Sequence, residues 1–148
     1  MQRSVWHVAA ALSGASGVGA AAYGAHALPK LIAADEAAEA AATRPPPPPR
    51  TAAAQAEAVW PPPKERVGRE GRELCFLRAN QQQMYHALLM AAAPLSRRPA
   101  AVGGLALAGT LSFCGSVYAV ALTGERSRGV AAPAGGFMLM GAWLALML

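Results

Sequence analysis

Three histidines lie within or beside long apolar segments of the sequence, and they are the side chains best suited to chemistry there. They are His7, His26 and His86. Ionisable groups are costly inside a bilayer, so a histidine in such a segment calls for a functional explanation. His26 and His86 could meet across two helices as metal or haem ligands, or as a proton relay. The sequence favours another interpretation, in which neutral histidines bond backbone carbonyls or polar neighbours such as Asn80 and Tyr23 and fix the helix register.

The other chemically capable residues do not form the pattern of an enzyme. Ser112 and Ser116 lie in an apolar segment, where serine hydroxyls usually bond carbonyls of their own helix. Cys75 and Cys114 form no CxxC pair and belong to different regions, so neither a disulfide framework nor a zinc site is supported. No CxxCH motif for covalent haem occurs, and no glycine-rich stretch carries the GK[ST] of a phosphate loop. We therefore expect no catalytic role and no cofactor.

Four long apolar segments predict an all-α membrane protein. Hydrophobic residues make up 54% of the sequence and charged residues only 14%, which is outside the usual balance of soluble proteins. The segment 101–122 has no charged residue and is long enough, as a helix, to cross a hydrocarbon core of about 30 Å. Together with 5–28, 74–95 and 130–148, it predicts a single membrane domain spanning the whole chain, built as a four-transmembrane-helix bundle. Alternatively, the first segment is a secretory signal peptide, since Arg3 precedes it and AHA near its end resembles a cleavage site.

Small residues recur every three or four positions along these segments and predict closely packed helices. In the segment 101–122 they form one side, against which we expect the rest of the chain to pack: Gly104, Ala108, Ser112, Gly115 and Ala119. In the first segment they form two series, Ser13, Gly17, Ala21 and Ser16, Ala20, Gly24. In the last segment they are Gly135, Gly136 and Gly141.

The first half of the segment 74–95 is polar. Its three consecutive glutamines, 81–83, cannot share one helical face. This half must lie at the membrane interface or inside the bundle, because polar groups that face lipid are left without partners. The candidate residues for helix packing and polar contacts are therefore Tyr23, Gly24, His26, Asn80, Tyr85, His86, Gly104, Ser112, Gly115, Ser116, Gly135 and Gly136.

A low-complexity extramembrane insertion is predicted at 33–73, between the first and second spans. Alanine, proline, arginine and glutamate dominate it, and its proline runs favour polyproline II. The alanine-rich stretches 33–42 and 51–59 could form short helices. Pro45, Pro48 and Arg50 fit a PxxPxR ligand motif, although a solvated spacer is the simpler interpretation.

The charge distribution bears on partners and orientation. Thirteen Lys and Arg residues against eight Asp and Glu give a net charge of +5, and most of these charges lie between 30 and 78. No basic helix interleaved with aromatics occurs, so nucleic-acid binding is a poor interpretation. The positive excess suits loops near anionic lipid headgroups. Four spans place both ends of the chain on one side, and the charge count favours the insertion in the cytoplasm or the mitochondrial matrix.

Four stretches of the sequence resemble a known family: ALSGASGVGAAAYGAHAL, MYHALLMAAAPL, FCGSVYAVALTG and APAGGFMLMGAWLALML. In this order they are similar to the transmembrane protein 256 family, over roughly 4–32 and 74–148. The resemblance implies a four-helix membrane protein, often mitochondrial in eukaryotes, and brings no established enzymatic activity. The proline-rich insertion departs from the family, whose members have a shorter connection containing an aromatic residue.

Three function hypotheses follow. The first is a non-catalytic accessory or structural subunit of a larger membrane assembly, such as a respiratory complex of the mitochondrial inner membrane, with the lipid bilayer and other membrane subunits as partners. The second is a small-solute carrier or pore, suggested by the polar cluster from Asn80 to His86, although no predicted span holds an acidic residue for ion coupling. The third is haem or metal binding through His26 and His86.

Overall fold

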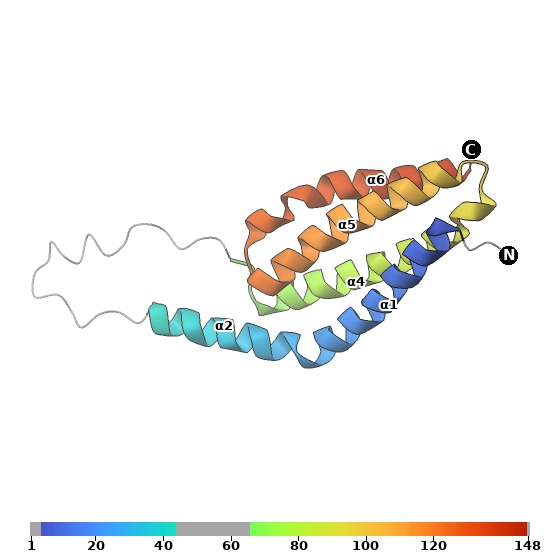
Figure 1. Cartoon of the computed structure of the whole chain (residues 1–148). Helices are drawn as coiled ribbons and strands as arrows, with labels where there is room; N and C mark the ends of the chain where they lie inside the picture. The colour runs from blue at the N-terminus through green and yellow to red at the C-terminus, as the bar shows by residue number, and fades with distance from the viewer. Residues whose placement is uncertain (1–3, 44–65, 148) are drawn as a thin grey trace, which may run out of the picture.

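The computed structural model describes residues 4–43 and 66–147, which form five α-helices and two short 3₁₀ helices (Figure 1). The α-helices are α1 (Val5–His26), α2 (Leu28–Ala42), α4 (Arg69–Ala92), α5 (Pro99–Thr123) and α6 (Ala132–Leu146). The 3₁₀ helices are η1 (Ala93–Leu95) and η2 (Arg126–Ala131). These residues contain no strand beyond an isolated bridge between Arg66 and Glu125, so the predicted all-helical fold is confirmed.

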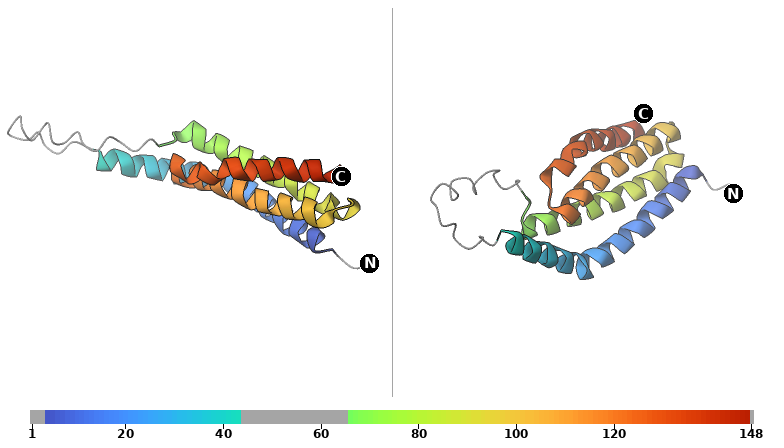
Figure 2. Two further views of the ribbon diagram at one scale, coloured as in Figure 1. Left: turned by 90° about the horizontal axis from the view of Figure 1, so that it is seen from above. Right: turned by 60° about the vertical axis from the view of Figure 1, so that its left-hand side comes forward.

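The four long helices lie side by side in the order α1, α4, α5, α6 (Figures 1 and 2). Each neighbouring pair is extensively packed and antiparallel, as the short connections η1 and η2 require. The start of α1 and the end of α6 lie at one end of the molecule, and α2 and η2 lie at the other (Figure 1). The row leaves α1 and α6 without a helix on their outer sides in the described part of the chain.

Three helical segments are long and apolar enough to cross a membrane. They are Val5–His26, Pro99–Thr123 and Arg126–Leu146, the last combining η2 with α6. The second predicted span differs from the expectation of 74–95, because α4 begins at Arg69 and carries several charged residues in its first turns. The expectation of four apolar spans therefore holds for three.

Pro29 ends α1 and starts α2. Its ring has no N–H to donate and clashes with the carbonyl of the residue four before it, so a continuous helix through this point is unfavourable. The chain instead breaks at Ala27 and restarts as α2, which leaves α1 at an angle and extends past the start of α4 (Figure 1). The segment 33–73, predicted as a low-complexity insertion, is helical at both described ends, and the possible short helix 33–42 is part of α2. Its proline runs and the predicted helix 51–59 lie outside the described residues.

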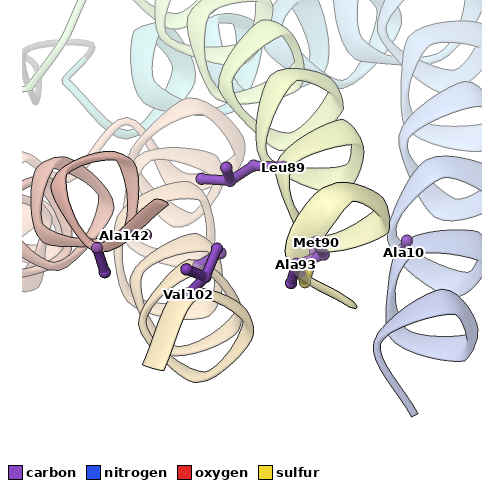
Figure 3. Close-up of a cluster of buried hydrophobic side chains, with 8 residues drawn as sticks. Ala10, Leu89, Met90, Ala93, Val102 and Ala142 are labelled. Carbon is purple, nitrogen blue, oxygen red and sulfur yellow. The ribbon is translucent and has the colours of Figure 1, made fainter. Parts of the chain in front are cut away.

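Two hydrophobic clusters hold the row together. The first lies at the end where α1 begins and draws on all four long helices (Figure 3): Ala10, Leu89, Met90, Ala93, Val102, Ala106, Ala142 and Ala145. The second lies at the other end and joins α2 to α4 and α5: Leu28, Ile32, Phe76 and Ala121. Because Leu28 and Ile32 are almost fully buried there, α2 belongs to the folded domain and is not part of a free spacer.

Candidate functional site

Polar side chains join α1, α4 and α5 about halfway along the molecule. Asn80 on α4 donates from Nδ2 to the carbonyl oxygen of Gly17 on α1 at 2.7 Å, and to the Tyr118 hydroxyl on α5 at 3.3 Å. The Tyr118 hydroxyl in turn donates to Oε1 of Gln83 at 3.0 Å. Asn80 thus contacts the neighbouring helices, as the sequence predicted, whereas Gln81 and Tyr85 in the same half of α4 are exposed.

Gln83 completes this polar network on the side of α1. Its Nε2 donates to the carbonyl oxygen of Ser13 at 2.9 Å and to the Ser16 hydroxyl at 2.8 Å. Asn80 and Gln83 are three residues apart, so they occupy one face of α4 and reach α1 one turn apart. The two amides therefore fix the register of α1 against α4, and their bonds are made to protein atoms.

Glycines on α1 let the two helices approach closely enough for these bonds. A Cβ on Gly17 would lie 2.7 Å from the sulfur of Met84, and one on Gly24 would lie 2.5 Å from the ring of Phe76. The Phe76 ring is buried between two tyrosines, with ring centroids 6.2 Å from Tyr23 and 5.0 Å from Tyr118. The packing roles predicted for Gly24 and Tyr23 thus correspond to real contacts between α1 and α4.

His86 is buried between α4 and α6. Its Nδ1 lies 2.7 Å from the carbonyl oxygen of Gln82, and Nε1 of Trp143 donates to its Nε2 at 3.3 Å. A carbonyl can only accept, so the imidazole is neutral with its proton on Nδ1, and Nε2 accepts from the indole. Both ring nitrogens are therefore occupied, in agreement with the expected role of fixing helix register.

The structure does not bring His26 and His86 together. His26 lies exposed in the last turn of α1, two residues beyond Gly24, which packs on Phe76. Along α4, Phe76 and His86 are about 15 Å apart, and His86 faces α6 instead of α1. His7 is exposed near the start of α1. The premise that His26 and His86 meet across the first two spans was wrong.

The predicted glycine contacts of α6 are present. A Cβ on Gly135 would collide with the backbone of Phe113 on α5, and a Cβ on Gly136 would lie 3.9 Å from the ring of the same phenylalanine. The two serines of α5 bond backbone carbonyls: Ser112 bonds Ala131 at 3.2 Å, and Ser116 bonds Phe113 of its own helix at 3.0 Å. Ser112 thus links α5 to η2, whereas Ser116 bonds within α5.

The predicted packing side of α5 was wrong in part. A Cβ on Gly104 or Gly115 would meet nothing within 4 Å among the described residues. The glycines that do pack are Gly103, which lies against the ring of Trp6, and Gly109, whose Cβ would lie 2.8 Å from the side chain of Leu139. Gly103 and Gly109 therefore lie on a different side of α5 from Gly104 and Gly115. Tyr85, another candidate, is exposed on α4.

A groove of about 620 Å³ runs between α1 and α5 over Gln83 of α4. Its walls are mostly apolar, and Gly115 lies in the α5 wall. Two buried hydroxyls that line it, those of Ser13 and Thr110, have no hydrogen-bond partner within the described part of the chain. The groove therefore lies directly beside the polar network, because Gln83 and Tyr118 belong to both.

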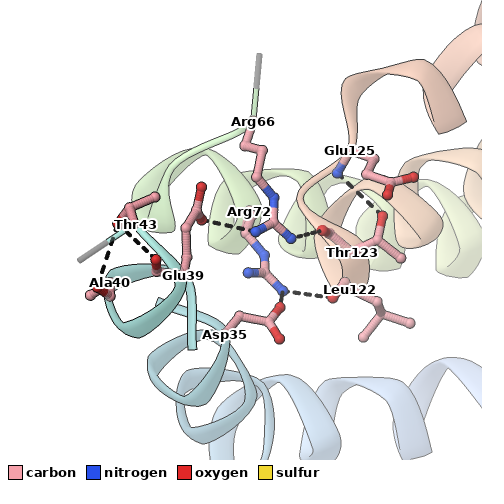
Figure 4. A network of polar contacts seen from close by, with 9 residues as sticks. All are labelled: Asp35, Glu39, Ala40, Thr43, Arg66, Arg72, Leu122, Thr123 and Glu125. Atoms are coloured by element: carbon pink, nitrogen blue, oxygen red, sulfur yellow. Dashed lines mark hydrogen bonds and ion pairs between the residues drawn. The ribbon is translucent and has the colours of Figure 1, made fainter. Parts of the chain in front are cut away.

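Arg72 forms a second polar cluster at the end of the molecule where α2 lies (Figure 4). The side chain is almost fully buried, and its guanidinium donates to the carbonyl oxygens of Ala121 at 2.8 Å and Leu122 at 2.6 Å. It also pairs with Asp35 of α2 at 3.0 Å. Close by, Arg66 pairs with Glu39 at 2.8 Å. The cluster ties α2 and the start of α4 to the last turn of α5.

Sequence reasoning missed three of these features. Arg72 fell inside the predicted insertion, where no signal separated it from the other arginines. Tyr118 was not among the candidate residues, although a tyrosine in an otherwise apolar span was a usable signal for a polar contact. Thr110 carried the same weak signal. Among residues 4–43 and 66–147, no group of three or more His, Cys, Asp or Glu side chains is arranged to hold a metal ion.

The family model described as "Protein of unknown function (DUF423)" matches residues 62–136, about half of the chain, including α4, α5 and the start of α6. No solved structure matches the chain.

Proposed function

The chain belongs to this family of proteins of unknown function, DUF423, and we propose that it is a non-catalytic structural subunit of a larger membrane assembly. The observation that carries the proposal is the outer side of α1. Only Ala10 and Gly17 are buried along this whole helix. Its outer side carries exposed small residues at four-residue spacing, Ala11, Ala15 and Gly19.

A small-residue series of this kind is how membrane helices bring their backbones close together. A Cβ on Gly19 would meet nothing within 4 Å in the described chain, so no contact within the subunit accounts for the glycine. Glycine in a helix interior costs roughly 0.5–1 kcal/mol relative to alanine. A partner helix lying along Ala11, Ala15 and Gly19 would recover that cost through close packing.

We propose further that α4 is a fourth span, shielded within the row. Its amides at Asn80 and Gln83 bond α1 and α5, and its buried Arg72 bonds the end of α5, so these polar groups do not face lipid. Arg78 lies near the polar end and can reach the headgroups along its aliphatic stem. Four spans agree with the resemblance to the transmembrane protein 256 family, and with it we propose the mitochondrial inner membrane as the location.

The other two hypotheses have less support. A carrier needs polar groups free to meet a solute, whereas the amides of Asn80 and Gln83 are engaged by protein atoms. Haem or metal binding through His26 and His86 requires the two side chains to lie close together, and they do not. We therefore keep the structural subunit as the proposed function.

Native electrophoresis of gently solubilised membranes, with mass spectrometry of the resolved bands, tests this proposal. At native expression levels, the chain is expected to migrate with a large assembly. Migration as a small lone species in the mildest detergent that keeps known assemblies intact would contradict it.

A further inference from the structure

We infer that the groove between α1 and α5 is a binding site for a neutral membrane lipid that carries a carbonyl or hydroxyl group on a long apolar body. The groove differs from the outer side of α1 used by the proposed function. At about 620 Å³ it falls within the usual range for small-molecule sites.

The hydroxyl of Thr110 lacks a hydrogen-bond partner in the described part of the chain, which indicates that a polar group of a ligand lies in the groove. Thr110 is only 6% exposed, and its Oγ1 has no hydrogen-bond partner among the described residues although it lines the groove. The Ser13 hydroxyl on the opposite wall is also buried and also has no hydrogen-bond partner among the described residues. Buried hydroxyls without a partner are unfavourable, and more so in a bilayer, where water does not compensate them. Both side chains line the groove, so a rotation about the Cα–Cβ bond would turn either hydroxyl, buried while the groove is empty, toward a ligand oxygen there.

The groove lining indicates that this ligand is neutral. No Asp, Glu, Lys, Arg or His lines the groove, and the surrounding walls are leucine, alanine, glycine and cysteine. A charged headgroup placed there would lose its hydration without gaining an ion pair. Gln83 and Tyr118 also line the groove, but they already bond each other at 3.0 Å, which leaves the two unpaired hydroxyls as the anchoring groups.

The depth of the groove separates this ligand from an ordinary phospholipid. Thr110 lies near the middle of α5, about 16 Å along the axis from Pro99. If α5 spans the bilayer, this is near its centre, where phospholipids present only acyl chains. The polar group that meets Thr110 and Ser13 must therefore belong to a lipid whose carbonyl or hydroxyl can lie deep in the hydrocarbon region.

A matched pair of photoreactive probes tests the site. Both are long-chain diazirines with an alkyne tag, identical except that one has a ketone in mid-chain and the other is a plain hydrocarbon. With the full chain in its native membranes, the ketone is expected to label peptides of α1 and α5 that line the groove roughly five- to tenfold more than the hydrocarbon, the ratio that one or two hydrogen bonds provide.

Two variants and one control make the test specific. Thr110→Val keeps the shape of the side chain and is expected to bring the ketone-to-hydrocarbon ratio down to about one. Gly115→Leu fills the groove without meeting any protein atom within 4 Å of its Cβ, and is expected to suppress labelling by both probes. Gly104→Leu, on the same helix with equally open surroundings but outside the groove lining, is expected to leave labelling unchanged.

Three outcomes overturn the inference. One is an unchanged ratio in Thr110→Val, and another is labelling spread evenly over all lipid-facing helices. The third uses a photoreactive amino acid in place of Leu111 in the groove wall. If this residue forms an adduct with another protein, a partner helix fills the groove. None of these depends on the outer side of α1, so the inference and the proposed function can fail separately.

Discussion

Arg72 caps the C-terminal end of α5 although it belongs to α4. The last carbonyls of a helix lack partners within it, and a buried guanidinium that donates to two of them supplies both hydrogen bonds and favourable charge. Its ion pair with Asp35 is the weaker contribution, because the Asp35 side chain is 36% exposed and therefore screened by solvent.

We predict that Arg72→Met lowers the free energy of unfolding by about 2–3 kcal/mol, since hydrogen bonds from a charged donor are lost at buried carbonyls. Asp35→Asn is predicted to lower it by less than about 1 kcal/mol. Denaturant titration in detergent micelles measures both. Equal losses in the two variants would mean that the ion pair, and not the capping of α5, holds this end together.

Thr110 gives a prediction of opposite sign. Its hydroxyl is buried without a partner in the described chain, so Thr110→Val removes an unsatisfied polar group while keeping the shape of the side chain. In delipidated detergent samples, the variant is expected to unfold at a higher temperature than the wild-type chain. Its free energy of unfolding is expected to rise by about 1 kcal/mol at most. A clear loss of stability would mean that the hydroxyl has a partner in the folded protein.

At the same scale, the sequence predicted some residue roles and could not predict others. A neutral histidine bonded to a backbone carbonyl was expected, and His86 is one, because any histidine buried in an apolar helix needs such a bond. Its second partner, Trp143, belongs to a helix whose position the sequence did not define. Arg72 was hidden for a similar reason, since its partners are carbonyls at the end of α5.

At the level of elements, glycine spacing predicted the packing of α1 on α4 but not that of α5. The α1 series contains Gly17 and Gly24, and both lie against α4. In α5 small residues occur on every side of the helix, so their spacing alone cannot say which side meets a neighbour. The predicted first span ended at Leu28, next to the observed break, but 33–42 was assigned to the insertion because it is rich in alanine, so α2 was not recognised as part of the packed domain.

A matched pair of alanine substitutions on α1 tests this packing. Gly24→Ala places a Cβ against the buried ring of Phe76 and is expected to cost about 1–3 kcal/mol of stability by overpacking. Gly14→Ala, on the same helix, meets nothing within 4 Å and is expected to be neutral or to stabilise by up to about 1 kcal/mol. If thermal unfolding in micelles ranks the two variants the other way, α1 does not lie against α4 in this register.

For the whole molecule, the decisive feature is that the helices form a row and not a closed bundle. A closed bundle would bury one side of every helix against the others, whereas α1 touches the rest mainly through α4 and exposes its opposite side (Figure 2). The apolar segments made helices long enough to cross a membrane predictable. The row itself was not predictable, because it depends on which sides of α4 and α5 are occupied.

The most direct test of the structural-subunit account is native electrophoresis of membranes that carry Gly19→Leu in place of the wild-type chain. A Cβ at this position meets nothing within 4 Å among the described residues, so the fold is expected to persist, while a partner helix packed on Ala11, Ala15 and Gly19 is displaced. Gly104→Leu is the control for an equally open glycine on another helix. The account predicts that Gly19→Leu releases the chain from its large assembly and that Gly104→Leu leaves it in place. Retention of both variants in the assembly would contradict the claim that α1 is the docking helix.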